Sequence, residues 1–164
     1  MTDLDNKISS EKIIEPSIEY EDGHSLTELW VSEKAVPDLS DDYVPNKFTL
    51  DLPQGGSRFV SCTIPPFSKI RSYELNKNGA FAEDLHGIHS TQTLDYVIVL
   101  EGQVDLVTNN GRQTLKKGDV VVQRGAKHAW HNISNTNCEI IAVMIGAQEN
   151  SRFKKHEFKQ IAKE

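Results

Sequence analysis

Residues 89–132 read HSTQTLDYVIVLEGQVDLVTNNGRQTLKKGDVVVQRGAKHAWHN, and this stretch decides the fold. Short runs rich in Val, Ile, Leu and Thr recur roughly every eight to twelve residues with turn formers between them, a spacing typical of an all-β sandwich or barrel. Asn110-Gly111 separates two of these runs and predicts a tight two-residue hairpin turn. The run Tyr96–Leu100 is apolar on both parities, which predicts a strand covered on both sides, with a bend or bulge at Gly102.

The same kinds of pattern continue on both sides of this stretch. Further strands are predicted over residues 25–32, 57–64, 70–75, 104–107, 113–115, 120–122, 130–133 and 139–145. Residues 36–47 and 76–87 lack such patterning and are expected to form loops. We therefore expect three parts: a flexible or swapped N-terminal arm over 1–18, a barrel domain over 19–147, and a C-terminal helical tail over 148–164.

Length and charge exclude several classes of protein. The chain has 164 residues and a formal net charge of −6, so one domain is expected, and the clustered basic surface of a nucleic-acid-binding protein is missing. No apolar run is long enough to span a membrane, and the first residues are acidic and polar, unlike a signal peptide. The two cysteines, Cys62 and Cys138, lie in apolar segments, where a reduced thiol acts as a small hydrophobe. A cytoplasmic protein is predicted.

Two motifs carry a resemblance to a known family. The first, at the start of the stretch, places His89, Thr91, Asp95 and Gly102 at fixed spacings; the second runs from Gly118-Asp119 to His128 and Asn132. Together they resemble a small single-domain cupin, a jelly-roll barrel whose first motif usually holds two histidines and a glutamate.

The chain departs from the usual pattern in four places. Thr91 replaces a histidine, Asp95 replaces the glutamate, Gln123 or Arg124 replaces a proline, and the loop before His128 is one residue short. The combination H-x-T-x-T-x-D-Y with V-Q-R-G-x-x-H-A-W-x-N resembles one subgroup of small cupins in which these substitutions are the ordinary pattern. The resemblance predicts an all-β cupin-type jelly-roll barrel with a short C-terminal helix, and it implies a homodimer.

Strand parity places the polar residues of both motifs on common faces. His89, Thr91, Thr93 and Asp95 share one face of a regular strand, and His128 shares its parity with Trp130. If His89, Asp95 and His128 meet, they form a two-histidine, one-carboxylate set that suits a divalent transition metal, with Zn, Fe, Mn and Ni not distinguished. The alternative is that these side chains hydrogen-bond one another or the backbone without any metal.

The neighbouring residues have competing interpretations. Thr91 and Tyr96 are candidates to orient water or substrate, and Thr93 is a candidate substrate contact. Trp130 is a stacking wall for an aromatic ligand or a core residue, and Arg124 binds a substrate carboxylate or a surface acid. The remaining histidines, His24, His86, His131 and His156, are expected to lie away from the site.

These features support two hypotheses about function. The first is a metal-dependent enzyme of decarboxylase, dehydratase or other lyase type that acts on a small oxygen-rich or aromatic acid. The second is a metal-free barrel that binds a small molecule without catalysis. Both predict a small-molecule ligand and neither involves nucleic acid or a membrane.

Overall fold

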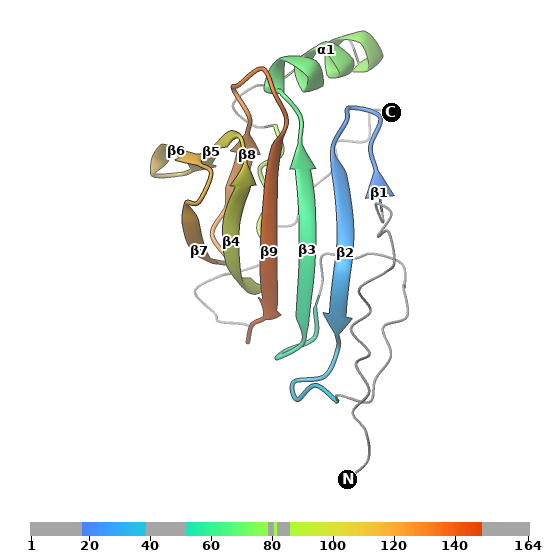
Figure 1. Ribbon diagram of the computed structural model, residues 1–164, viewed down its shortest axis with the longest axis vertical. Helices are drawn as coiled ribbons and strands as arrows, with labels where there is room; N and C mark the ends of the chain where they lie inside the picture. Colours follow the sequence, from blue (N-terminus) through green and yellow to red (C-terminus); the bar gives the residue numbers. More distant parts are fainter. Residues whose placement is uncertain (1–17, 39–51, 79–80, 82–85, 149–164) are drawn as a thin grey trace, which may run out of the picture.

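The computed structural model describes residues 18–38, 52–78, 81 and 86–148. It consists almost entirely of antiparallel strands in two sheets (Figure 1). In chain order the elements are β1 (Ile18–Glu19), β2 (Ser25–Ser32), β3 (Ser57–Ile64), α1 (Phe67–Asn78), β4 (Thr93–Glu101), β5 (Gln103–Thr108), β6 (Gly111–Lys116), β7 (Val120–Arg124), β8 (His128–His131) and β9 (Cys138–Gly146). The six-stranded sheet has the order β1-β2-β3-β9-β4-β7 and the three-stranded sheet has the order β6-β5-β8. The predicted all-β jelly-roll barrel is therefore confirmed.

The core lies between the two sheets and follows the two-residue period of the strands. Along β9 every second residue is buried, beginning with Cys138, and Val97 and Val99 of β4 face the same interior. Val104 of β5, with no exposed surface, contributes from the other sheet. Both cysteines are free. Alternation thus gives each strand one face toward the core and one face away from it.

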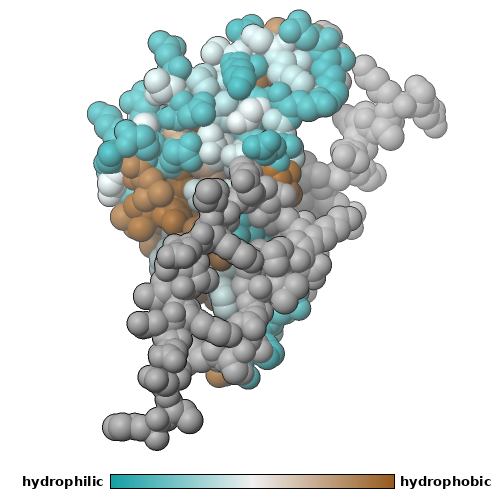
Figure 2. All heavy atoms as spheres, turned by 45° about the vertical axis from the view of Figure 1, so that its right-hand side comes forward, coloured by the Kyte–Doolittle hydropathy of each residue, from teal (hydrophilic) through white to brown (hydrophobic). Residues whose placement is uncertain are grey.

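The prediction that β4 is covered on both faces is wrong. The apolar run in this strand suggested cover on both sides, but Tyr96, Ile98 and Leu100 are at least 40% exposed. Their side chains lie on the outer face of the six-stranded sheet, because they alternate with the buried Asp95 and Val97. In the view of Figure 2, the main apolar area lies on the left, and smaller apolar areas lie among the polar residues elsewhere.

Helix α1 is a second correction, because the sequence predicted a strand over residues 70–75. Pro65 and Pro66 end β3, and the carbonyl of Pro66 accepts hydrogen bonds from the amides of Lys69 and Ile70, which begins a helix. Of the helix residues whose burial is described, only Phe67 and Ile70 are well buried. Two contacts one turn apart give too weak a helical period to recognise in the sequence.

The turn between β5 and β6 also differs in detail. Thr108 pairs with Gly111, so the two turn residues are Asn109 and Asn110 rather than Asn110 and Gly111. Among the described residues only glycines have positive φ, and Gly111 is one of them. The break at Gly102 is as predicted: its φ is +75°, and the pairing of β4 with β9 shifts register beside it, between Val99 and Glu101.

Several expectations fall on residues that the structure does not describe. The N-terminal arm lies outside the described residues, except that Ile18 already pairs with Leu26 in the sheet. The C-terminal helical tail, His156 included, also lies outside them. In the part of the chain that is described, no helix has the length and apolar character needed to cross a membrane.

Candidate active site in the barrel cavity

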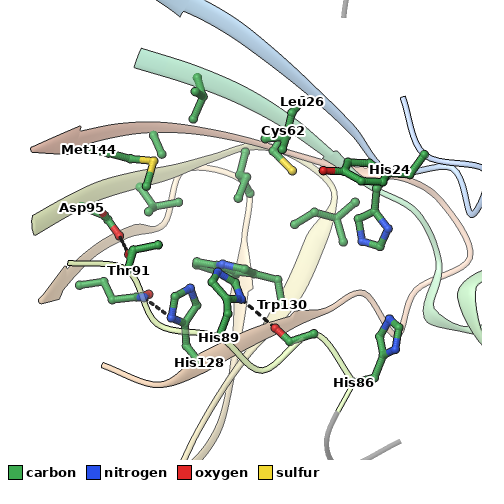
Figure 3. Close-up of a pocket in the computed structure, with 18 of the residues that line it drawn as sticks. His24, Leu26, Cys62, His86, His89, Thr91, Asp95, His128, Trp130 and Met144 are labelled. Carbon is green, nitrogen blue, oxygen red and sulfur yellow. Dashed lines mark hydrogen bonds between the residues drawn. The ribbon is translucent and has the colours of Figure 1, made fainter. Parts of the chain in front are cut away.

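A cavity of about 360 Å³ lies inside the barrel and is lined from both sheets (Figure 3). Its apolar wall comes mainly from β3 and β9, with residues such as Val60, Ile140 and Ala142. Its polar side chains come from β4, β7, β8, the β1–β2 hairpin and the loop before β4. The volume falls in the lower part of the range of small-molecule sites.

Two histidines far apart in the sequence meet in this cavity. His89 lies just before β4, His128 begins β8, and an isolated antiparallel bridge joins them. The backbone amide of each donates to the carbonyl of the other at 2.9 Å. Directly opposed residues in such a bridge share one face. The two rings consequently lie with their centroids 4.2 Å apart in the cavity (Figure 3).

Backbone carbonyls fix the proton on each of these rings. His89 Nδ1 lies 2.7 Å from the carbonyl oxygen of Gly87, and His128 Nδ1 lies 2.9 Å from that of Ala126. A carbonyl only accepts hydrogen bonds, so Nδ1 of His89 carries the proton and donates. Nδ1 of His128 does the same when the Gln123 carboxamide, which also contacts this atom, turns its oxygen toward the ring. The lone pair of each ring is then at Nε2, the arrangement that metal-binding histidines use. Burial, followed by the nearby His89, lowers the pKa of His128 to about 4, so this ring is neutral at neutral pH.

Asp95 reaches the same cavity from β4 and is 6% exposed. Thr93 Oγ1 donates to Thr91 Oγ1 at 2.7 Å, and Thr91 Oγ1 donates to Asp95 Oδ2 at 3.4 Å. The other oxygen, Oδ1, is buried without a hydrogen-bond partner among the described residues. Burial raises the pKa of Asp95, although the hydrogen bonds from Thr93 and Thr91 and the nearby His89 act in the opposite direction. A carboxyl group held in this way is suited to exchanging a proton with a ligand.

The donor set fits a divalent metal only in part. The two Nε2 atoms with their carbonyl-bound partners fit well. Within the described residues, however, no group of three or more His, Cys, Asp and Glu side chains is arranged to hold a metal ion. Asp95 is held by Thr91 and does not complete a three-ligand group with His89 and His128. The predicted set is therefore not assembled in this structure, and metal binding stays a prediction.

Two other predicted residues lie at the site as expected. Thr91 lines the cavity, and Trp130 lines it beside His128, with the two rings edge to face and their centroids 5.9 Å apart. Thr93 is 2% exposed and lies behind Thr91, so it supports the cavity wall without lining it. A stacking surface for an aromatic ligand is thus present beside the histidines.

The predicted positions of Tyr96 and Arg124 are corrected by the structure, because neither side chain lines the cavity. Tyr96 follows Asp95 on β4, and its ring is 43% exposed on the outer face of the sheet. Arg124 is exposed at the end of β7, where it pairs with Leu94. Both follow a residue that faces inward, so strand parity turns their side chains outward.

Sequence analysis also did not assign several polar residues that line the cavity, among them Gln123, His24 and His86. Gln123 is 6% exposed, lies opposite Asp95 in the register of β4 and β7, and contacts His128 Nδ1 through its carboxamide. His24 and His86 were expected at the surface, yet both line the cavity. Parity with Asp95 could have identified Gln123, whereas the two histidines come from a turn and a loop that have no period.

The other buried histidine lies where it was expected, away from the cavity. His131 stacks on Phe67 of α1 with ring centroids 4.3 Å apart, and its Nε2 lies 3.0 Å from the carbonyl oxygen of His86. Cys62 lines the cavity, but burial raises the pKa of its thiol to about 12, so it is no ready nucleophile.

Part of the chain is similar to known proteins. The Cupin_2 family, described as a cupin domain, matches residues 73–144. Phomopsin biosynthesis cluster protein D of Diaporthe leptostromiformis is 50% identical over 74 residues, which are 44% of this chain and 36% of that protein. The cupin-domain-containing oxidoreductase virC of Hypocrea virens is 44% identical over 48 residues, 29% of this chain and 25% of that protein.

The chain thus matches only about a third or less of the length of these relatives. A solved Cupin 2 conserved barrel domain protein from Salinispora arenicola is 15% identical, covers 76% of each chain and has a TM-score of 0.42. The matched segment, residues 73–144, contains β4 to β8 and with them both histidines of the bridge. The chain thus has a cupin-type barrel fold, and its residues 73–144, which match the Cupin_2 domain, carry most of the polar side of the cavity.

Proposed function

We propose that this cupin is a metal-dependent enzyme of lyase type that acts on a small oxygen-rich or aromatic acid. One observation carries the proposal: two imidazoles, each with Nδ1 within hydrogen-bond distance of a backbone carbonyl, line one cavity with a buried carboxyl group whose Oδ1 has no partner among the described residues. Neutral nitrogen donors next to a proton-exchanging group are the parts that decarboxylation and dehydration require.

Each residue has a distinct role in this proposal. His89 and His128 would hold a divalent transition metal, which when bound would polarise an oxygen of the ligand. Asp95, whose pKa is raised by burial, exchanges a proton with the ligand, and Thr91 orients it through its hydroxyl group. The ring of Trp130 and the apolar strands β3 and β9 exclude water around an aromatic body.

The place of the ligand's acid group follows from what lines the cavity. Arg124 points away, and none of the described residues that line the cavity is Lys or Arg. A carboxylate would therefore be held at the His89 and His128 end, where a bound cation would supply the compensating charge.

Two alternatives are separable by experiment. The relatives named as cupin-domain oxidoreductases support a redox reaction, which would require an oxidant such as dioxygen and would show oxygen uptake. The absence of any three-ligand group among the described residues is compatible with the metal-free binding barrel, which would bind aromatic acids with or without a metal.

The decisive test is the metal content of the full chain, measured by elemental analysis before and after reconstitution with Zn²⁺, Mn²⁺, Fe²⁺ or Ni²⁺. We expect about one equivalent of one of these metals, lost in His89→Gln and His128→Gln. His24→Gln is the matched control, since it removes a histidine from the same cavity and should keep the metal. Less than about a tenth of an equivalent after reconstitution would exclude the metal-dependent enzyme.

A further inference from the structure

The cavity has a second polar end that the proposed chemistry does not use. Figure 3 shows Asp95 at one end, and His24 and His86 at the other, with the paired histidines between. His24 belongs to the turn between β1 and β2, and His86 to the loop before β4. Both line the same cavity as Asp95.

At this end an aspartate fixes the orientation of one imidazole. Asp22 Oδ2 lies 2.9 Å from His24 Nδ1, and Asp22 Oδ1 accepts a hydrogen bond from the backbone amide of His24 at 3.0 Å. Both carboxylate oxygens thus bind the same residue. With its Nδ1 proton directed at the carboxylate, the ring keeps Nε2 available as a hydrogen-bond acceptor.

The turn that carries this pair is held from two sides. Within it, the amide of Gly23 donates to the carbonyl of Tyr20 at 2.8 Å, and Gly23 has a φ of +96° that favours glycine. Outside it, Glu21 accepts hydrogen bonds from Tyr73 and Lys77 of α1. These contacts keep the Asp22–His24 pair in one position relative to the cavity.

His86 adds a second ring at this end. It packs against Phe67 and Phe81, with ring centroids 5.9 Å and 5.0 Å apart, and burial lowers its pKa, so the ring is neutral at neutral pH. The lining also includes apolar residues such as Ile140 and Val60. The cavity therefore offers polar side chains at Asp95, at the paired histidines and at the His24 end, together with apolar wall.

We propose that the Asp22–His24 pair binds a hydroxyl group at the far end of the ligand. The hydroxyl donates to His24 Nε2, Asp22 positions the ring, and the cavity selects molecules with an acid at one end, an apolar body and a hydroxyl at the other. The acid end rests on the proposed function, since it is the end held by His89 and His128. The hydroxyl end depends on different residues.

The test is isothermal titration of the full-length, metal-reconstituted protein with 4-hydroxycinnamate and with cinnamate, which differ only in the hydroxyl group. We expect 4-hydroxycinnamate to bind about tenfold more tightly. In His24→Phe, the two acids should bind equally, because no acceptor then faces the hydroxyl group; His24→Leu provides a second variant if the first does not fold. Asp22→Asn should reduce the advantage of the hydroxyl group, measured as the ratio of the two Kd values. Ser25→Ala, next to His24 but outside the lining, should keep the full advantage.

The outcomes distinguish this proposal from the function on which it rests. If the wild type binds both acids equally and His128→Gln abolishes both, the acid end is correct and the hydroxyl end is wrong. If His24→Phe keeps the tenfold preference, the hydroxyl is bound elsewhere and the proposal is also wrong. If neither acid binds the wild type, the aromatic-acid class is wrong and the hydroxyl end is wrong with it.

Discussion

His128 is buried in the native protein, so a proton on its ring destabilises the folded state. Its pKa is lowered to about 4 from an ordinary 6.5, so between these values the unfolded chain binds more protons than the native protein. Stability of the metal-free protein is then gained as the pH rises from 4 to 6.5 and lost as it falls. At 1.36 kcal/mol per unit, the contribution of this residue is about 3 kcal/mol.

We predict that His128→Gln weakens this acid dependence. The measurement is the free energy of unfolding by urea between pH 4 and 7, with the metal-free wild type as reference. The difference between the two proteins should change by about 3 kcal/mol across the range. Parallel curves would show that His128 is not held neutral by burial.

Asp95 gives a second prediction, with the opposite sign. Because burial raises its pKa, the native protein binds more protons than the unfolded chain above pH 3.8, and stability falls as pH rises through this window. Asp95→Asn removes that loss, so its melting temperature at pH 7 should equal or exceed that of the wild type. Turnover of an aromatic acid should fall by a factor of about 10² or more, because the proton-exchanging group is gone.

A thermal scan and a product assay on the same preparation check this prediction. Thr93→Val is a useful comparison, since it removes the hydroxyl that bonds Thr91 without removing the carboxyl group. A fall in melting temperature of Asp95→Asn at pH 7 would mean that the ionised carboxylate stabilises the fold.

At the level of residues, the sequence predicted the parts of the site that strand parity controls. Thr91, Asp95, His128 and Trp130 all line the cavity, as alternation along two strands required. The prediction for Arg124 was wrong because the residue of β7 that faces inward is the one before it. The Asp22–His24 pair was missed because only the contacts of a turn with the rest of the fold place it at the cavity.

Gly102 illustrates how an element depends on one backbone conformation. It has a φ of +75°, and a Cβ there would lie 2.7 Å from the carbonyl oxygen of Asn137. We predict that Gly102→Ala destabilises the protein by about 3 kcal/mol or more, from both backbone strain and collision. Gly118→Ala is the matched control: its φ is +90° but no atom lies within 4 Å of the added Cβ, so about 1 kcal/mol is expected. Equal losses in urea unfolding would exclude a role for the collision.

The elements were predictable where their period is strong. Residues 25–32 and 57–64 form β2 and β3 with the predicted bounds. The segment that became α1 was misassigned because a short surface helix with two core contacts resembles an apolar strand in sequence. The cover of β4 was misjudged because an apolar run does not say whether its outer face meets another layer.

At the scale of the whole molecule, the homodimer stays a prediction, and the outer face of the six-stranded sheet is the surface that it would bury. A row of apolar side chains crosses five paired strands there: Trp30, Phe59, Val143, Tyr96 and Val122. Four of these are between 37% and 58% exposed. A monomer rarely leaves so continuous an apolar surface open, and a twofold axis would pair it with itself.

We predict that the wild type sediments as a dimer and that Val122→Lys shifts it to the monomer, since the new charge would be buried without a partner. Gln113→Lys places the same charge on the exposed strand β6 and should leave the dimer intact. Sedimentation velocity over a wide concentration range is the measurement. A monomeric wild type would show that this face does not pair with itself.

The backbone bridge between His89 and His128 has one further consequence. It joins the loop that enters the large sheet to a strand of the small sheet, so the two rings become neighbours only when the barrel closes at that seam. We expect a molecule or ion that binds both rings to stabilise the contact between the two sheets. Local unfolding at the bridge should then be slower, and the two bridging amides should be protected from hydrogen exchange. Ligand binding to the two rings and closure of the barrel at this bridge are therefore coupled.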